Sequence, residues 1–185
     1  MASLTGQTIA ATYKRLLTID SENFAADASA KYIKDGDAGT ASALSLSTTR
    51  VGIGTTAPAV DLEVMDTTTS SASTGPTLYL SSNDGAAMGS GHRLGGLAFV
   101  GAEDGSNTQR EGAVIDALTS DAWSGTENGT ILRFWTNDAD NSLTQKMCIL
   151  EGGEVGIGTA APTKELHIVG TTLIDCGDDE GDYGL

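Results

Sequence analysis

Histidine is the usual acid–base catalyst near neutral pH, and the chain contains only two. His92 lies in Gly-His-Arg before an apolar run, and His167 lies on the polar side of a strand-like segment. A hydrolase would need one of them close to a serine and a carboxylate. Serine and aspartate are too abundant to be informative, and the residue that matches His167 in an internal repeat is Glu63. We therefore expect no catalytic residue and no enzymatic activity.

Three other patterns could bind ligands, and each has a plainer explanation. Asp35-Gly36-Asp37 offers oxygen ligands for Ca²⁺, but the glutamate that closes a calcium loop is absent and Asp-Gly is typical of tight turns. Gly-x-Gly at Gly52 and at Gly156 lacks the third glycine, the lysine and the following helix of phosphate-binding loops. Cys148 and Cys176 show no metal-ligand spacing and no disulfide framework. The sequence predicts no metal site within one chain and no cofactor, and it leaves open a metal ion on the axis of a trimer.

The aromatic residues could provide a stacking surface for a sugar. Phe134 and Trp135 alternate within one strand-like run, so at least one of them should pack in a core. Trp123 lies in a loop rich in Ser, Gly and Thr. It is therefore the better candidate for contact with a glycan receptor.

The composition predicts a chain that cannot bury enough surface alone. About one residue in five is Leu, Ile, Val or Phe, and aromatic residues are 5%. Ordering a residue costs about 1–2 kcal/mol of backbone entropy, whereas burial returns about 25 cal/mol per Å² of apolar surface. Small side chains return little, so we expect obligate oligomerisation. Disorder is the alternative, and the clear strand patterns argue against it.

The net charge of −15 excludes several classes of partner. Binding to nucleic acid or to an anionic membrane needs clustered Lys and Arg. No run approaches the ~18 apolar residues of a membrane span, and the N-terminus does not resemble a signal peptide. We expect neither nucleic-acid binding nor membrane insertion, and the acidity is explained by solubility. A reducing assembly compartment fits the two cysteines.

Alternation of apolar and polar residues predicts several strands, separated by Asp-Gly, Asn-Gly and Asn-Asp turns. Early strand-like stretches are Tyr13–Asp20 and Ala43–Ser47. The strands expected in a central block are Thr77–Ser81, Arg93–Val100, Ala113–Leu118, Ile131–Thr136 and Leu143–Leu150. No convincing amphipathic helix interrupts them. This spacing predicts an antiparallel sheet or a sandwich.

One unit of sequence occurs twice, 104 residues apart. Val51-Gly52-Ile53-Gly54-Thr55 matches Val155-Gly156-Ile157-Gly158-Thr159, and each copy continues through Ala-Pro to a short apolar strand. On the same offset, Leu46 aligns with Leu150. The offset is too long for a solenoid repeat, so we interpret the unit as one module used on either side of an inserted domain.

Each copy reads as a strand–turn–strand element with one narrow apolar face. Glycines between the apolar residues allow another backbone to approach closely, and proline imposes an extended turn. One copy has too little core to stand alone, but three copies around an axis could fuse their cores. The residues expected in this trimer core are Val51, Ile53, Pro58, Leu62, Val64, Val155, Ile157, Pro162, Leu166 and Ile168.

The form V-G-I-G-T-x-x-P-x-x-x-L-x-V resembles a unit of bacteriophage tail-fibre and related virion-fibre proteins, of the marine-phage type. Tyr13–Leu17 followed by Asp35–Ser47 is similar to the opening of such fibres, and Gly96–Phe99, Leu132–Thr136 and Lys146–Ile149 resemble their central block. In that family the unit recurs along trimeric β-structured shafts, often before a self-cleaving chaperone domain. The sequence lacks that domain, which leaves open a cleaved, a naturally short or a truncated fibre.

The expected fold is therefore all-β: an elongated trimeric fibre segment in which strand–turn–strand collars bracket a central antiparallel β-domain. The regions expected are a virion-anchoring segment (1–47), a first repeat (48–66), a central domain (67–150), a second repeat (151–170) and an acidic tail (171–185).

The resemblance implies a homotrimeric tail fibre or spike that serves virion assembly and host attachment. Its partners would be its own copies, another virion protein at the N-terminal region and a host receptor. The chain would be assembled in the host bacterial cytoplasm and located in the virion. The alternatives are a capsid-bound head fibre or decoration protein, and a glycan-binding receptor module.

Overall fold

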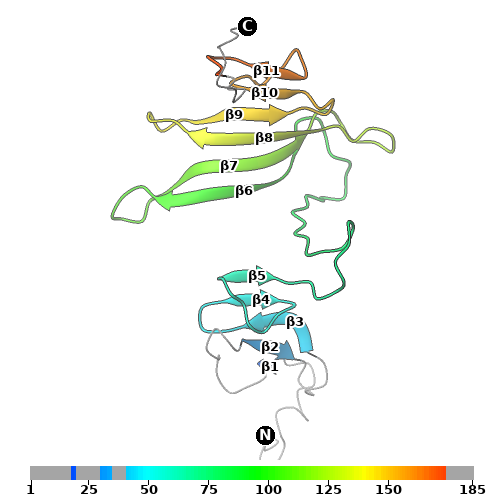
Figure 1. Cartoon of the computed structure of the whole chain (residues 1–185), viewed down its shortest axis with the longest axis vertical. Helices are drawn as coiled ribbons and strands as arrows, with labels where there is room; N and C mark the ends of the chain where they lie inside the picture. Colours follow the sequence, from blue (N-terminus) through cyan, green and yellow to red (C-terminus); the bar gives the residue numbers. More distant parts are fainter. Residues whose placement is uncertain (1–17, 20–29, 35–40, 174–185) are drawn as a thin grey trace, which may run out of the picture. The chain divides into compact units, whose positions relative to one another are not determined.

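The structure is a computed structural model of the chain, and it describes residues 18–19, 30–34 and 41–173. These residues form eleven β-strands and no helix, which confirms the all-β prediction. The strands make two sheets, one in each of two compact units, Met1–Leu78 and Tyr79–Leu185 (Figure 1). None of the described residues belongs to a helix with the length and apolar character that crossing a membrane requires.

The first sheet has five short strands in the order of the sequence. Its first four strands pair antiparallel, whereas the last two pair parallel to each other. The strands are β1 (Thr18–Ile19), β2 (Lys31–Lys34), β3 (Ala41–Leu46), β4 (Val51–Ile53) and β5 (Leu62–Val64).

The second sheet has six strands, also neighbours in the order of the sequence. The first five strands pair antiparallel, and the last pair is again parallel. The strands are β6 (Arg93–Ala102), β7 (Gln109–Thr119), β8 (Thr130–Asn137), β9 (Leu143–Ile149), β10 (Val155–Ile157) and β11 (Leu166–Ile168). Four of the five strands predicted for the central block are confirmed, and they form the antiparallel sheet that was expected.

Two expectations are wrong, and one strand was missed. Thr77–Ser81 forms no strand although its residues alternate, because no neighbouring strand pairs with it. The strand β2 was not predicted, because its four residues begin and end with lysine. The sandwich alternative also fails, since each unit contains one sheet in the described residues.

The two repeats are the closing strands of the two sheets. In each copy an antiparallel strand, β3 or β9, precedes the repeat, and the two strands of the repeat follow it in the sheet. Leu46 pairs with Val51, and Ile149 pairs with Val155. The counterpart of Leu46 is therefore Ile149, and its alignment with Leu150 is wrong because the turn before the second repeat is one residue longer.

The chain buries few large apolar side chains. Among the described residues the buried hydrophobic positions are Ala30, Val114 and Cys148. The turn expected at Asp35-Gly36-Asp37 and the acidic end with Cys176 lie outside the described residues. The five-region division of the chain stays a prediction, although each repeat belongs to the sheet that precedes it rather than forming a separate body.

Candidate functional site

A short loop connects the two parallel strands of each repeat and packs on one face of its sheet. Parallel strands usually need a crossover of a dozen or more residues, but only residues 54–61 connect β4 to β5. Pro58 in this loop is less than 2% exposed, and Gly52 on the strand beneath is buried. The loop therefore covers the face of the sheet toward which a side chain at Gly52 would point.

The first glycine of each repeat leaves room for this loop and for a small side chain on the neighbouring strand. Ser45 lies opposite Gly52, and its hydroxyl donates a hydrogen bond to the Thr55 carbonyl at 2.6 Å. A Cβ on Gly52 would lie 2.6 Å from the Ser45 Oγ and would overlap the Thr55 carbonyl oxygen. Any side chain at this glycine would displace the loop.

The second copy repeats this arrangement with a thiol. Cys148 lies opposite Gly156, and its Sγ donates to the Thr159 carbonyl at 3.5 Å. A Cβ on Gly156 would lie 3.0 Å from that sulfur and 3.3 Å from the Cδ of Pro162. The equivalent loops of the two repeats thus pack on equivalent faces of their sheets.

The second glycine of each repeat turns the chain out of the strand. Gly54 and Gly158 have φ angles of 78° and 72°, which side-chain-bearing residues rarely adopt. A Cβ on Gly158 would also lie 2.7 Å from the Val169 carbonyl oxygen. Both the conformation and the close approach require glycine here.

The opposite face of each sheet carries apolar side chains that the loop does not cover. In the first sheet, cross-strand pairing aligns two rows on β3, β4 and β5, which together form the first apolar stripe. Its residues are Leu44, Ile53 and Val64 in one row, and Leu46, Val51 and Leu62 in the other.

The second apolar stripe crosses all six strands of the second sheet. One row is Leu97, Ile115, Phe134, Met147, Ile157 and Ile168, and the next is Ala117, Leu132, Ile149, Val155 and Leu166. None of these side chains is charged. Leu97 at one end is 50% exposed and Leu166 at the other end is 58% exposed, so both ends of the stripe are open to solvent. Leu80 packs on this face beside Gly95, which pairs with Ala117, and the side chains on β7 to β9 are half-buried.

The predicted core residues divide between the two faces. Val51, Ile53, Leu62, Val64 and their four counterparts in the second repeat lie on the stripes. Pro58 and Pro162 lie on the opposite face, where they pack within their own unit. Sequence reasoning missed the contribution of β6 to β9, although the alternation of Leu97, Ile115 and Phe134 with polar or small residues is a usable signal.

No model of a known protein family matches the chain, and no curated protein matches its sequence.

The other face of the second sheet holds a charged cluster around Asp116. This carboxylate is 5% exposed and accepts two hydrogen bonds from Arg133, at 3.0 and 2.7 Å, and one from the Trp135 indole, at 3.0 Å. Arg93 lies 3.4 Å away. Burial raises the pKa of Asp116, but the hydrogen bonds and the two guanidinium charges outweigh burial and hold the pKa below its usual value.

This cluster also assigns Trp135 a structural role. The Arg133 guanidinium lies over its ring at 4.7 Å from the centroid, in cation–π geometry. Because the indole N–H and the ring both have partners, Trp135 packs within the sheet. Phe134 points to the opposite face and belongs to the second apolar stripe.

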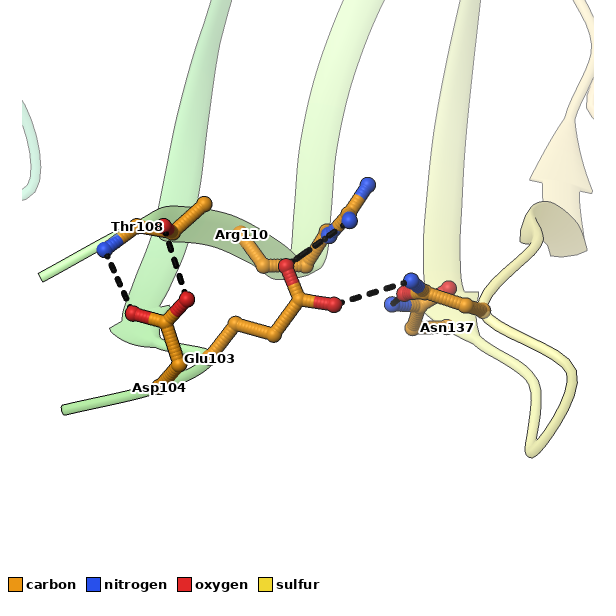
Figure 2. A network of polar contacts seen from close by, with 6 residues as sticks. Glu103, Asp104, Thr108, Arg110 and Asn137 are labelled. Atoms are coloured by element: carbon orange, nitrogen blue, oxygen red, sulfur yellow. Dashed lines mark hydrogen bonds and ion pairs between the residues drawn. The ribbon is translucent and has the colours of Figure 1, made fainter. Parts of the chain in front are cut away.

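A second polar network ties two turns of the sheet together. Glu103 accepts two hydrogen bonds from Arg110, at 3.1 and 2.8 Å, and one from Asn141 in the β8–β9 turn, at 3.4 Å. Figure 2 shows the Glu103 carboxylate between Arg110 and Asn137, the last residue of β8. Asp104 accepts from the Thr108 amide and hydroxyl, which lowers its pKa. These exposed contacts order the turns and add little stability.

The remaining candidate residues do not converge. The Nδ1 of His92 accepts from the Gly89 amide at 3.2 Å and so belongs to a turn. The Nδ1 of His167 is buried and has no hydrogen-bond partner among the described residues. Trp123 lies in the loop between β7 and β8. Within the part of the chain that the structure describes, no group of three potential metal ligands occurs.

Proposed function

We propose that the chain is a structural virion protein, a homotrimeric phage tail-fibre or spike segment whose copies meet through the two apolar stripes. The observation that supports this most directly is the second apolar stripe, which is apolar on six strands yet exposed at both ends in the single chain. Uncovered apolar surface of this extent marks interaction sites in soluble proteins. Burying it between copies would supply the core that the single chain lacks.

The dimensions of the stripe favour three copies over two. Its two rows lie two residues apart along each strand, about 7 Å, whereas six strands extend about 24 Å across the sheet. A two-copy sandwich buries broad sheet faces against each other. A stripe that is narrow along the strands and long across them fits an axis shared by three copies.

The duplication supports a repeated structural element. Both repeats cover one face with their own loop and leave the Val, Ile and Leu side chains on the other. In such a module one face is packed by its own loop, and the other face presents apolar side chains to neighbouring copies. Several modules can therefore follow one another along an axis, and each adds its own contacts between copies. This arrangement agrees with the resemblance of the repeat to units of trimeric virion-fibre shafts.

The resemblance supplies the rest of the proposal. Residues 1–47 would dock on another virion protein, and the assembled protein would serve host attachment in the virion. A capsid-bound head fibre or decoration protein would use the same interface with a different attachment point. Locating the N-terminal region in a map of the virion would distinguish these alternatives.

Mass measurement in solution tests the central claim. Light scattering after size exclusion, together with native mass spectrometry, should give three times the chain mass of 18.8 kDa. Chemical crosslinking at low protein concentration should give dimer and trimer bands and nothing larger. A folded, stable monomer would refute the proposal, and a stable dimer would refute its symmetry.

A further inference from the structure

A groove lies between two coil segments of the second unit, 81–88 and 123–128. The Trp123 amide donates to the Met88 carbonyl at 2.8 Å, and this hydrogen bond joins the two segments. The groove has a volume of about 590 Å³. Most of its lining residues are exposed, so the groove is a shallow surface depression and not an enclosed cavity.

Trp123 gives the groove an aromatic wall. Its indole N–H donates to the Gly129 carbonyl at 3.1 Å, so the ring is held in one orientation. The side chain is half-buried and lines the groove. The face of an indole ring is electron-rich and attracts the positively polarised C–H groups of a sugar ring.

The polar lining of the groove is neutral. It consists of serine hydroxyls and asparagine amides, with no ionisable side chain. The Oδ1 of Asn83 accepts from the Gly85 amide at 3.0 Å, which leaves the NH₂ of Asn83 without a partner among the described residues. The hydroxyls of Ser81 and Ser82 are equally unpaired there. Such groups can donate to and accept from the hydroxyls of a ligand.

Acidic residues flank this neutral lining. Asp84, Asp121 and Glu127 are exposed and lie on or beside the two segments. Together with the net charge of −15, they disfavour an anionic ligand.

We propose that this groove binds a neutral saccharide, with one sugar ring stacked on Trp123 and its hydroxyls bonded to Ser82 and Asn83. The groove lies within one unit, so the proposal does not depend on the number of copies in the assembly. Sequence reasoning selected Trp123 alone, because the wall that faces it comes from a segment some 40 residues earlier in the chain.

The test is a printed array of neutral and acidic oligosaccharides probed with the full chain, followed by calorimetric titration of the best neutral one. Trp123→Ala should abolish binding. Asn83→Asp keeps the acceptor for the Gly85 amide but replaces the donor with a negative charge, and it should weaken binding at least about tenfold. Trp135→Phe is the matched control, and it should bind as the unchanged chain does.

Three outcomes would overturn the proposal. They are no binding to any neutral saccharide, a preference for sialylated or uronate glycans, or binding by Trp123→Ala and Asn83→Asp that is as strong as that of the unchanged chain. Circular dichroism establishes that each variant is folded. If Trp123→Ala does not fold, the result for Asn83→Asp decides.

Discussion

Ser45 and Cys148 occupy equivalent positions in the two sheets and make the same hydrogen bond with different atoms. Each lies opposite the first glycine of its repeat. The Ser45 hydroxyl donates to the Thr55 carbonyl at 2.6 Å, and the Cys148 thiol donates to the Thr159 carbonyl at 3.5 Å. The position therefore requires a small side chain with a donor, and the two copies meet that requirement independently.

Cys148→Ser should be tolerated. The first copy already uses serine at this place, so we expect the free energy of unfolding to change by less than about 1 kcal/mol. Cys148→Leu should cost more than about 2 kcal/mol, because the larger side chain would displace the loop. Thermal unfolding at matched protein concentration measures both changes. Equal destabilisation by the two substitutions would contradict the role assigned to Cys148.

Gly158→Ala should destabilise the second unit by at least about 2 kcal/mol. The residue has a φ of 72°, and a Cβ would lie 2.7 Å from the Val169 carbonyl oxygen. Gly101→Ala is the control, because a Cβ there meets nothing within 4 Å. We expect the control to change stability by less than about 1 kcal/mol. Denaturant unfolding compares the two, and a Gly158→Ala variant as stable as the control would disprove the requirement.

Leu166→Lys should disrupt the oligomer. Leu166 is 58% exposed in the single chain and lies on the second apolar stripe, where a charge would be buried between copies. Val169→Lys is the matched control, since Val169 is 57% exposed but lies beyond the end of β11. Light scattering should show a reduced mass for Leu166→Lys alone.

The first repeat offers the same comparison with other residues. Leu62 on the first apolar stripe and Val60 in the crossover loop are both 57% exposed. Their lysine variants therefore differ in position, while the two replaced side chains have the same exposed fraction. If Val60→Lys and Val169→Lys dissociate the oligomer while both leucine variants retain it, the copies meet through the other face.

Stability should depend on the ionisation of Asp116. Its pKa in the folded chain is lower than the ordinary value of about 3.9, so the charged carboxylate stabilises the fold above that pH. This contribution is lost as the pH falls through the lowered pKa of the folded state. Asp116→Asn should therefore be about 1–3 kcal/mol less stable near neutral pH, and the difference should shrink in acid below about pH 4.

Unfolding of the two proteins over a series of pH values measures this difference. A difference that stays constant from neutral pH into strong acid would show that the packing of Asp116 matters and its charge does not. A Trp135→Phe variant, which removes one neutral donor from the cluster, should show a smaller loss than Asp116→Asn.

Strand positions could be predicted correctly where a segment of alternating apolar and polar residues also pairs with a neighbouring strand. Residues such as Leu97, Ile115 and Phe134 alternate with polar or small residues, and each lies on a strand near the predicted bounds. Thr77–Ser81 alternates as well but pairs with nothing, and alternation alone does not reveal whether a partner exists. Only one wall of the groove at Trp123 could be predicted from the sequence, because the other wall depends on the path of the coil segment 81–88.

By itself, the sequence determined that the chain is all-β, that one glycine- and proline-containing module occurs twice, and which residues of that module are apolar. These properties are local, since they follow from side-chain alternation and from the backbone limits of Gly and Pro. Only the tertiary structure decided that the two strands of the module run parallel, that the loop covers the glycine face, and that Ser45 corresponds to Cys148. Pairing direction and register depend on contacts between residues distant in sequence, and a turn longer by one residue shifts them without changing the motif.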